Sequence, residues 1–325
     1  MKKAILHSAH FQLTHRCNLE CVFCGQSKGL LASEELEMAP AEWIRVASQL
    51  KKEAEKNALT PQVMLWGGEP LLYKGFDFLA ETLKNDGFRL SMVSNATLLN
   101  EHAEVVKNCI DNINISIDGD QALHNSVRGA GIFEKVRENL KLIKNRKGKL
   151  VFLCTISDLN VDIFPDIPYK LMALEPDEII LQPLMYLNSS EIAEYRSFSK
   201  EYFNRDYPEL LAWERNDGEK YQQKIQVGLE IFNSRTYPIP VRFTPHALNN
   251  YPNEKSCDTA WNRVHIRHDG EVGFCTDYFS FSAGNVKEKS LEEIFYSAEA
   301  EKFRSAILEE KLPICRHCPW RLQKF

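Results

Sequence analysis

Three cysteines stand close together near the start of the chain, at a spacing suited to binding a metal cluster. Cys17, Cys21 and Cys24 are separated by three and by two residues, and they follow a short apolar segment at residues 9–14. Three thiols this close cannot all pair with one another as disulfides, but their thiolates can bind three irons of a [4Fe–4S] cluster. The fourth iron would stay open, as in metal sites that are catalytic. A zinc knuckle is the alternative on spacing alone.

A second set of cysteines lies in the last quarter of the chain and has enough thiolates to saturate a metal site. Its four members are Cys257, Cys275, Cys315 and Cys318. Asp269-Gly270 between two short apolar segments predicts a hairpin that brings the first two cysteines towards each other. A predicted helix over residues 291–308 then returns the chain to the last two. Four thiolates suit either zinc or a [4Fe–4S] cluster, and their number does not decide between the two.

The apolar patterns predict parallel strands that alternate with helices. Six short runs read as strands, at residues 9–14, 63–66, 89–93, 113–117, 150–155 and 178–182. Helical periodicity between them implies crossover connections and a parallel sheet, in a fold of the α/β class. Six such units are too few to close an eight-stranded barrel. Enzymes of this architecture place their chemistry at the carboxyl ends of the strands.

Polar residues do follow the predicted strands. Trp66-Gly67-Gly68-Glu69-Pro70 comes after the second strand, where glycine allows close approach of backbone to a ligand and Glu69 offers an acceptor for an ammonium group. The further candidates are Ser94 and Asn95 after the third strand, Ser116 and Asp118 after the fourth, Arg128 in the segment 124–129, and Thr155 and Gln182 at the ends of the fifth and sixth. Ordinary polar loop residues are the alternative interpretation.

Together these motifs resemble those of radical S-adenosylmethionine (SAM) enzymes. The C-x3-C-x2-C loop with Phe23 before its last cysteine, the Gly-Gly-Glu-Pro motif and the H-x-x-x-R-G segment occur in the family's order. The resemblance implies that Cys17, Cys21 and Cys24 hold a [4Fe–4S] cluster whose open iron binds SAM. One electron would then split SAM and release a 5′-deoxyadenosyl radical. The implied fold is a partial (β/α)6 TIM-like barrel.

The resemblance also implies individual contacts to SAM. Phe23 would lie against the adenine, and Arg128 would pair with the SAM carboxylate. The amino group would be bound by the motif Gly67, Gly68, Glu69 and Pro70. Contacts to the ribose and the methionine moiety are expected from Ser94, Asn95, Ser116 and Asp118, and contacts to SAM or substrate from Thr155 and Gln182.

The C-terminal cysteines resemble those of the SPASM/twitch extension that some radical SAM enzymes carry. The C-x12-G-x4-C spacing from Cys257, followed by Gly284-Asn285-Val286, supports this resemblance. It implies an auxiliary [4Fe–4S] cluster on Cys257, Cys275, Cys315 and Cys318, with zinc as the alternative. The sequence stops seven residues after Cys318, so we expect one auxiliary cluster. With four protein ligands this cluster would have no open iron and would serve electron transfer or support.

Two further residues are candidates for catalytic roles. Asp277, two residues after Cys275, would act as a general base beside the auxiliary cluster, and capping a turn is the alternative. Cys154 would donate a hydrogen atom if the enzyme were an epimerase. Since Thr155 is expected to point into the barrel, Cys154 is expected to point outward.

The predicted organisation has three parts. Residues 1–188 form the radical SAM barrel core, 189–250 a helical insertion and linker, and 251–325 a small α+β auxiliary domain. Only about eight residues precede the first strand, so recognition of a leader peptide is expected from another surface or another protein.

The predicted function is hydrogen abstraction from a peptide or protein residue, leading to oxidation, cross-linking or epimerisation. Dehydrogenation or epimerisation of a sugar or aminocyclitol is the alternative reaction, and a non-catalytic iron–sulfur carrier is the alternative of another class. The expected partners are a peptide or small-molecule substrate and a low-potential electron donor such as flavodoxin or ferredoxin.

Composition excludes other classes of protein. A net charge of −5 leaves no electrostatic footprint for nucleic-acid binding. No apolar run approaches the ~18 residues that a membrane helix needs. The chain is therefore expected in the cytoplasm, where clustered cysteines bind metal rather than form disulfides.

Overall fold

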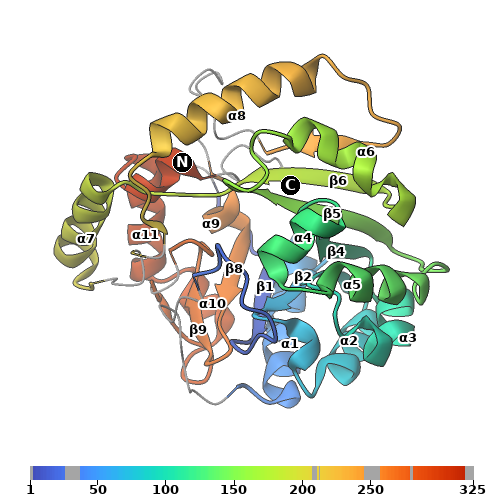
Figure 1. Cartoon of the computed structure of the whole chain (residues 1–325). Coiled ribbons are helices and arrows are strands. Elements are labelled where there is room, and N and C mark those ends of the chain that lie inside the picture. Colours follow the sequence, from blue (N-terminus) through green and yellow to red (C-terminus); the bar gives the residue numbers. More distant parts are fainter. Residues whose placement is uncertain are drawn as a thin grey trace.

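A single ten-stranded sheet organises the residues that the structure describes (Figure 1). This computed structural model describes residues 3–25, 37–206, 211, 213–244, 257–278 and 281–318. The strand order is β10-β9-β8-β1-β2-β3-β4-β5-β6-β7. The strands are β1 (Ser8–Thr14), β2 (Gln62–Gly67), β3 (Arg89–Ser94), β4 (Asn112–Ser116), β5 (Lys149–Ile156), β6 (Glu178–Pro183), β7 (Val241–Phe243), β8 (Arg263–Ile266), β9 (Glu271–Gly273) and β10 (Gly284–Asn285).

The first six strands pair in parallel with their sequence neighbours, which confirms the predicted α/β alternation. The crossover helices are α1 (Pro40–Glu55), α2 (Phe76–Asn85), α3 (Leu99–Cys109), α4 (Gln121–Arg128), α5 (Ile132–Lys141) and α6 (Ile167–Leu171). Their apolar sides cover one face of the sheet; the rings of Phe11 on β1 and Trp43 on α1 lie 4.6 Å apart. This packing excludes water from the helix-covered face and forms the main core.

Burial alternates along the strands because successive side chains point to opposite faces. Ile113 and Ile115 on β4 are fully buried under the helices, whereas Asn112, Asn114 and Ser116 on the other face are only half-buried. The same alternation holds in β2 and β3. The inner face, which we define as the face of β1 to β6 opposite α1, therefore keeps accessible surface.

The C-terminal segment extends the same sheet. β8 pairs in parallel with β1, and β9 pairs antiparallel with β8 around Asp269-Gly270, as the predicted hairpin requires. Arg45 on α1 donates to the Val286 carbonyl at 2.6 Å. The helices of this segment are α9 (Thr259–Asn262), α10 (Leu291–Phe295) and α11 (Ala298–Leu308).

Three elements differ from the sequence expectation. The single helix expected over residues 291–308 is two helices, because Ser297 caps a new start by accepting from the Ala300 amide. The segment that carries Arg128 is helix α4, where no helix was expected. A seventh parallel strand, β7, pairs with β6, and its three residues are too short to show a period.

Within its described residues, the segment 189–250 contains two α-helices. α7 (Ser189–Phe203) packs on the C-terminal segment, with Tyr195 stacked on Tyr278 at 4.5 Å, and α8 (Gly218–Asn233) lies above β6 in Figure 1. Within the described residues, no helix combines the length and the apolar character needed to cross a membrane.

Candidate active site

The cysteine loop lies at the carboxyl end of β1 and is held against α4. Val22 donates its amide to the Val127 carbonyl at 3.1 Å, and Cys24 donates to the Cys21 carbonyl at 3.0 Å. Burial raises the pKa of Cys21, and the thiols of Cys24 and Cys17 raise it further. The three thiols are therefore within electrostatic range of one another, as ligands of one cluster must be.

Arg128 connects the cysteine loop to the end of β4. Its Nε donates to Asp118 at 2.6 Å, and a second guanidinium nitrogen lies 3.6 Å from the sulfur of Cys21. The Asp118 side chain is fully buried and that of Arg128 is 9% exposed. Arg128 also lies over the Phe23 ring, 5.9 Å from its centre. A guanidinium here lowers the pKa of Cys21 against the effect of burial and so favours the thiolate.

Glu69 is fully buried and anchored from two strands. Its Oε1 accepts from the Ser94 hydroxyl at 2.8 Å and from the Leu71 amide at 3.2 Å, and its Oε2 accepts from the Asn95 amide at 2.8 Å. Burial raises the pKa of Glu69 to about 7, although these hydrogen bonds and Arg128 lower it. A carboxylate has about four acceptor positions, so one remains on Oε2.

Glycine is required at Gly67 and Gly68 because neighbouring backbone lies too close for any side chain. A Cβ at Gly67 would lie 2.4 Å from the Thr14 carbonyl oxygen, and one at Gly68 would lie 2.2 Å from the Arg16 carbonyl oxygen. We expected these glycines to let the backbone approach a ligand closely. In the structure, the backbone at these glycines instead approaches the segment that enters the cysteine loop. These glycines let the two predicted motifs sit side by side.

The remaining predicted SAM contacts fall into two groups. Ser94 and Asn95 support Glu69, and Asn95 also donates to the Asn18 side chain at 3.0 Å within the cysteine loop. Half-buried side chains on the inner face belong to Ser116, Thr155 and Gln182. Pro70 is buried and begins the short 3-10 helix Pro70–Leu72.

A pocket of about 410 Å³ opens between the cysteine loop and the carboxyl ends of β5 and β6. Phe23 contributes one wall from the cysteine loop. Residues 157–159 follow β5, residues 184–186 follow β6, and residues 213–217 cross both strand ends as the outer wall. The volume lies within the range of small-molecule sites in proteins.

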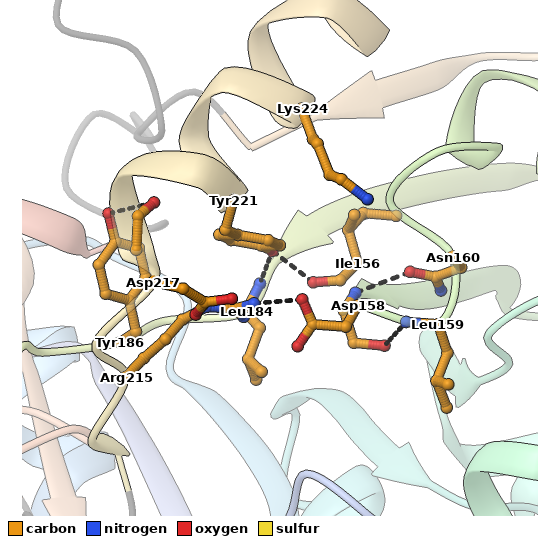
Figure 2. Close-up of polar contacts among 12 residues, drawn as sticks. Ile156, Asp158, Leu159, Asn160, Leu184, Tyr186, Arg215, Asp217, Tyr221 and Lys224 are labelled. Carbon is orange, nitrogen blue, oxygen red and sulfur yellow. Dashed lines mark hydrogen bonds and ion pairs between the residues drawn. The ribbon is translucent and has the colours of Figure 1, made fainter.

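Two side chains fix the outer wall (Figure 2). Tyr221 on α8 donates to the Ile156 carbonyl at 2.5 Å and accepts from the Leu184 amide at 2.9 Å. Arg215 pairs with Asp217 at 2.7 Å and with Asp158, and its guanidinium lies 4.2 Å from the centre of the Tyr221 ring. No motif marks these residues in the sequence, because they are brought together from three separate segments.

The C-terminal cysteines also converge. Burial raises the pKa of Cys275 well above its ordinary value, and the charges of Asp277, Cys318 and Cys257 raise it further. Cys257 and Cys318 therefore both lie within electrostatic range of Cys275. Burial alone raises the pKa of Asp277 to about 6. Cys315 is half-buried and packs against the core.

Cys154 does not reach the inner face. It is fully buried within the hydrophobic core on the helix-facing side of β5, as its neighbour Thr155 predicts. Burial raises the pKa of its thiol well above the ordinary value. Since the thiol has no exposed surface, it cannot reach a substrate on the inner face, and the predicted hydrogen-donor role does not fit its position.

Family models match the two regions of the chain that carry these cysteine sets. A model described as the radical SAM superfamily matches residues 11–167, and a SPASM model described as an iron–sulfur cluster-binding domain matches residues 257–319. The chain belongs to the radical SAM superfamily and carries a SPASM domain. This radical SAM enzyme therefore has a [4Fe–4S] cluster that works with SAM and an auxiliary iron–sulfur cluster.

Two proteins of Bacillus subtilis are similar to this chain in sequence. The enzyme is 29% identical to the sporulation killing factor maturation protein SkfB of Bacillus subtilis over 49% of this chain and 38% of SkfB. It is 23% identical to the antilisterial bacteriocin subtilosin biosynthesis protein AlbA of the same organism over 95% of this chain and 66% of AlbA. The chain thus spans less than two thirds of both relatives.

The same fold occurs in a solved structure. SuiB of Streptococcus suis bound to S-adenosylmethionine superposes with a TM-score of 0.71 and 14% identity, covering 97% of this chain and 72% of SuiB. The parallel sheet with its C-terminal extension is therefore shared.

The donor sets fit iron–sulfur clusters. Within the described ranges, no three His, Cys, Asp or Glu side chains are arranged to hold a single metal ion. A single zinc ion draws its thiolate sulfurs to within about 4 Å of one another, because each Zn–S bond is about 2.3 Å long. A cubane carries each thiolate on a different iron and spaces them more widely. Thiolates are the usual ligands of iron–sulfur clusters, so both cysteine sets fit the clusters that the two family models imply.

Proposed function

We propose that this enzyme modifies a residue of a peptide or protein substrate by removing a hydrogen atom from one of its C–H bonds. The observation that carries the proposal is the pocket beside the cysteine loop, which is lined by Phe23 and continues towards the carboxyl ends of β5 and β6. A substrate there would lie next to the SAM-binding cysteines. When bound, the cluster and SAM supply the radical that takes the hydrogen atom.

The chain's own residues have defined tasks in this proposal. Cys17, Cys21 and Cys24 hold the cluster, and Phe23 covers the adenine from within the pocket wall. Arg128 binds the SAM carboxylate with the guanidinium nitrogens that Asp118 and Cys21 leave available, since a guanidinium has five N–H donors. Glu69 accepts from the SAM amino group with the remaining position on Oε2.

The contacts to the rest of SAM follow the strand ends. Ser116 and Thr155 reach it from the inner face, and Ser94 and Asn95 hold Glu69 in place. On the substrate side, Gln182 lies at the end of β6, where the pocket begins.

A peptide substrate is supported by the relatives. SkfB and AlbA are named for the maturation of a killing factor and the biosynthesis of a bacteriocin. SuiB has also been solved bound to the precursor peptide SuiA, although with 14% identity this neighbour shows the fold alone. The same proposal includes a low-potential donor such as flavodoxin or ferredoxin, a cytoplasmic location, and Asp277 as the general base when the product is oxidised.

The proposed organisation keeps the barrel core over residues 1–188, the helical insertion over 189–250 and the auxiliary domain over 251–325. Cys257, Cys275, Cys315 and Cys318 hold one auxiliary cluster in this proposal. The matched radical SAM region at residues 11–167 and SPASM region at residues 257–319 support the two outer parts.

The test is the formation of 5′-deoxyadenosine by the anaerobically reconstituted and reduced enzyme with SAM. We expect product from the wild type and from Cys109→Ser, and none from Cys21→Ala. Cys109 ends α3, away from the cysteine loop, and so serves as the matched control. Product from Cys21→Ala would contradict the cluster assignment.

The substrate class needs a second arm of the same assay. Short peptides encoded beside the gene should raise the yield of 5′-deoxyadenosine over the background without substrate, and the peptide should change in mass. Stimulation by amino sugars or aminocyclitols alone would contradict the peptide proposal.

A further inference from the structure

Strands β8, β1 and β2 present polar side chains side by side on the face of the sheet opposite α1. Because β8 pairs with β1, the inner face continues onto β8. His265 is the register partner of His10, and Gln12 is the register partner of Trp66. Paired residues of neighbouring strands point to the same face of a sheet. Since Phe11 contacts α1 on the opposite face, these four side chains face away from the helices.

Several of their polar atoms have no hydrogen-bond partner among the described residues. Gln12 is 4% exposed and His265 is 3% exposed. Within the described part of the chain, no hydrogen bond reaches Oε1 of Gln12, Nε1 of Trp66 or either ring nitrogen of His265. A buried polar group without a partner destabilises the folded state, and native proteins keep few of them. Unpaired polar atoms gathered on three adjacent strands indicate that a ligand binds there.

The three groups form one surface. The rings of Trp66 and His265 lie 4.9 Å apart, and those of His10 and His265 lie 6.2 Å apart in an edge-on arrangement. The indole of Trp66 therefore reaches from β2 towards β8, over β1. Gln12 lies between them in strand order, as the register partner of Trp66.

The chemistry of these groups selects an uncharged ligand. Burial lowers the pKa of His265 to about 3, so its ring is neutral at physiological pH and has one donor and one acceptor. The Gln12 oxygen accepts and the Trp66 N–H donates. Arg263, a cation on this face, donates from Nε to the Ser8 hydroxyl at 3.2 Å. A ligand that both donates and accepts hydrogen bonds without charge complements this set.

We propose that Gln12, Trp66 and His265 bind an uncharged amide group of the substrate on the inner face of the sheet. The inference rests on the proposed function and adds a binding surface below the carboxyl ends of the strands. An amide offers its N–H to Gln12 or His265 and its carbonyl oxygen to Trp66. Because His265 comes from β8, the SPASM domain supplies part of the substrate site in addition to holding a cluster.

The test is nuclear magnetic resonance of the holoenzyme labelled with 15N at histidine, with SAM present. The probe is N-acetylglycine N-methylamide, which has two amide groups and no charge. We expect the ring signals of His265, assigned by their loss in His265→Leu, to shift saturably with probe concentration. Gln12→Leu should weaken the apparent affinity about threefold to tenfold, as expected for one hydrogen bond.

Two controls separate binding from general effects. His102→Gln removes a histidine on α3 whose ring bonds to Asp77, and it should leave the affinity unchanged. His265→Asn keeps a donor and an acceptor at the position and should bind the probe more tightly than His265→Leu, measured by competition for the peptide-stimulated yield of 5′-deoxyadenosine. Iron content and circular dichroism should be the same in all variants.

Three results would overturn the inference: no saturable shift of His265, an unchanged affinity in Gln12→Leu, or a stronger response to acetate or methylammonium than to the amide. If peptides stimulate 5′-deoxyadenosine formation but the amide shifts no signal, only this inference fails. If the amide binds but no peptide stimulates, the proposed function fails and the binding surface stands.

Discussion

The ion pair of Arg128 with Asp118, 2.6 Å long, is buried directly beneath the cysteine loop. Asp118 also accepts from the Thr155 amide at 3.0 Å, so one carboxylate fixes both Arg128 and the end of β5. The guanidinium is thereby held 3.6 Å from the sulfur of Cys21. Asp118, just after β4, thus fixes the position of the positive charge beside Cys21, a predicted ligand of the cluster.

We predict that Asp118→Asn destabilises the fold and abolishes SAM cleavage. It leaves the buried Arg128 without a counter-charge, which costs about 3–5 kcal/mol. The measurement is anaerobic denaturant unfolding followed by circular dichroism, together with the 5′-deoxyadenosine assay. Asp120→Asn is the control, because Asp120 is 41% exposed and caps α4, a role that asparagine also fills. A loss under ~1 kcal/mol in Asp118→Asn would show that the pair is dispensable.

Gly68→Ala should prevent assembly of the SAM-binding cluster. The new Cβ would lie 2.2 Å from the Arg16 carbonyl oxygen, so the backbone next to Cys17 has to move. Iron analysis should find about four irons lost per chain. In Gly87→Ala the Cβ meets nothing within 4 Å, so its positive φ costs about 1–2 kcal/mol without affecting iron. Full iron content in Gly68→Ala would refute this account.

Cys275→Ala should remove the auxiliary cluster and leave the other intact. Cys275 lies within range of Cys257 and Cys318, and its thiolate is one of the four expected to hold the auxiliary cluster. Iron should fall from about eight to about four per chain, while cleavage of SAM without substrate continues. Cys109→Ser should keep all the iron. A wild type with about four irons and one zinc would instead identify the auxiliary site as zinc.

Tyr221→Phe should loosen the outer wall of the pocket. Its hydroxyl donates to the Ile156 carbonyl and accepts from the Leu184 amide, so the variant loses two buried hydrogen bonds. The Leu184 amide also donates to the Ile156 carbonyl at 2.9 Å, and this backbone contact then has to hold the two strand ends alone. We expect a loss of about 1–3 kcal/mol in stability and faster hydrogen exchange of the Leu184 amide. Tyr169→Phe removes a hydroxyl from a residue that is 44% exposed and should change stability by less than ~0.5 kcal/mol. Equal effects in the two variants would rule out a special role for Tyr221.

The order of strands and the polar motifs at their ends were predictable from the sequence. Apolar runs such as 113–117 are bounded by polar residues, so they reveal where a buried strand begins and ends. Motifs such as Gly67–Glu69 are local, and the chemistry of their residue types can be read without coordinates. The helix α4 was missed because only two of its residues, His124 and Val127, are buried, which is too few to show helical periodicity.

The sequence by itself determined the alternation of strands with helices and, through the family resemblance, predicted that two cysteine sets hold iron–sulfur clusters. Only the tertiary structure decided what surrounds those cysteines. Register pairs Gln12 with Trp66 and His10 with His265, and folding brings Arg215 and Tyr221 over the ends of β5 and β6. The reason is physical: residue type and spacing specify local structure, whereas contacts between distant segments depend on how the sheet is paired and covered.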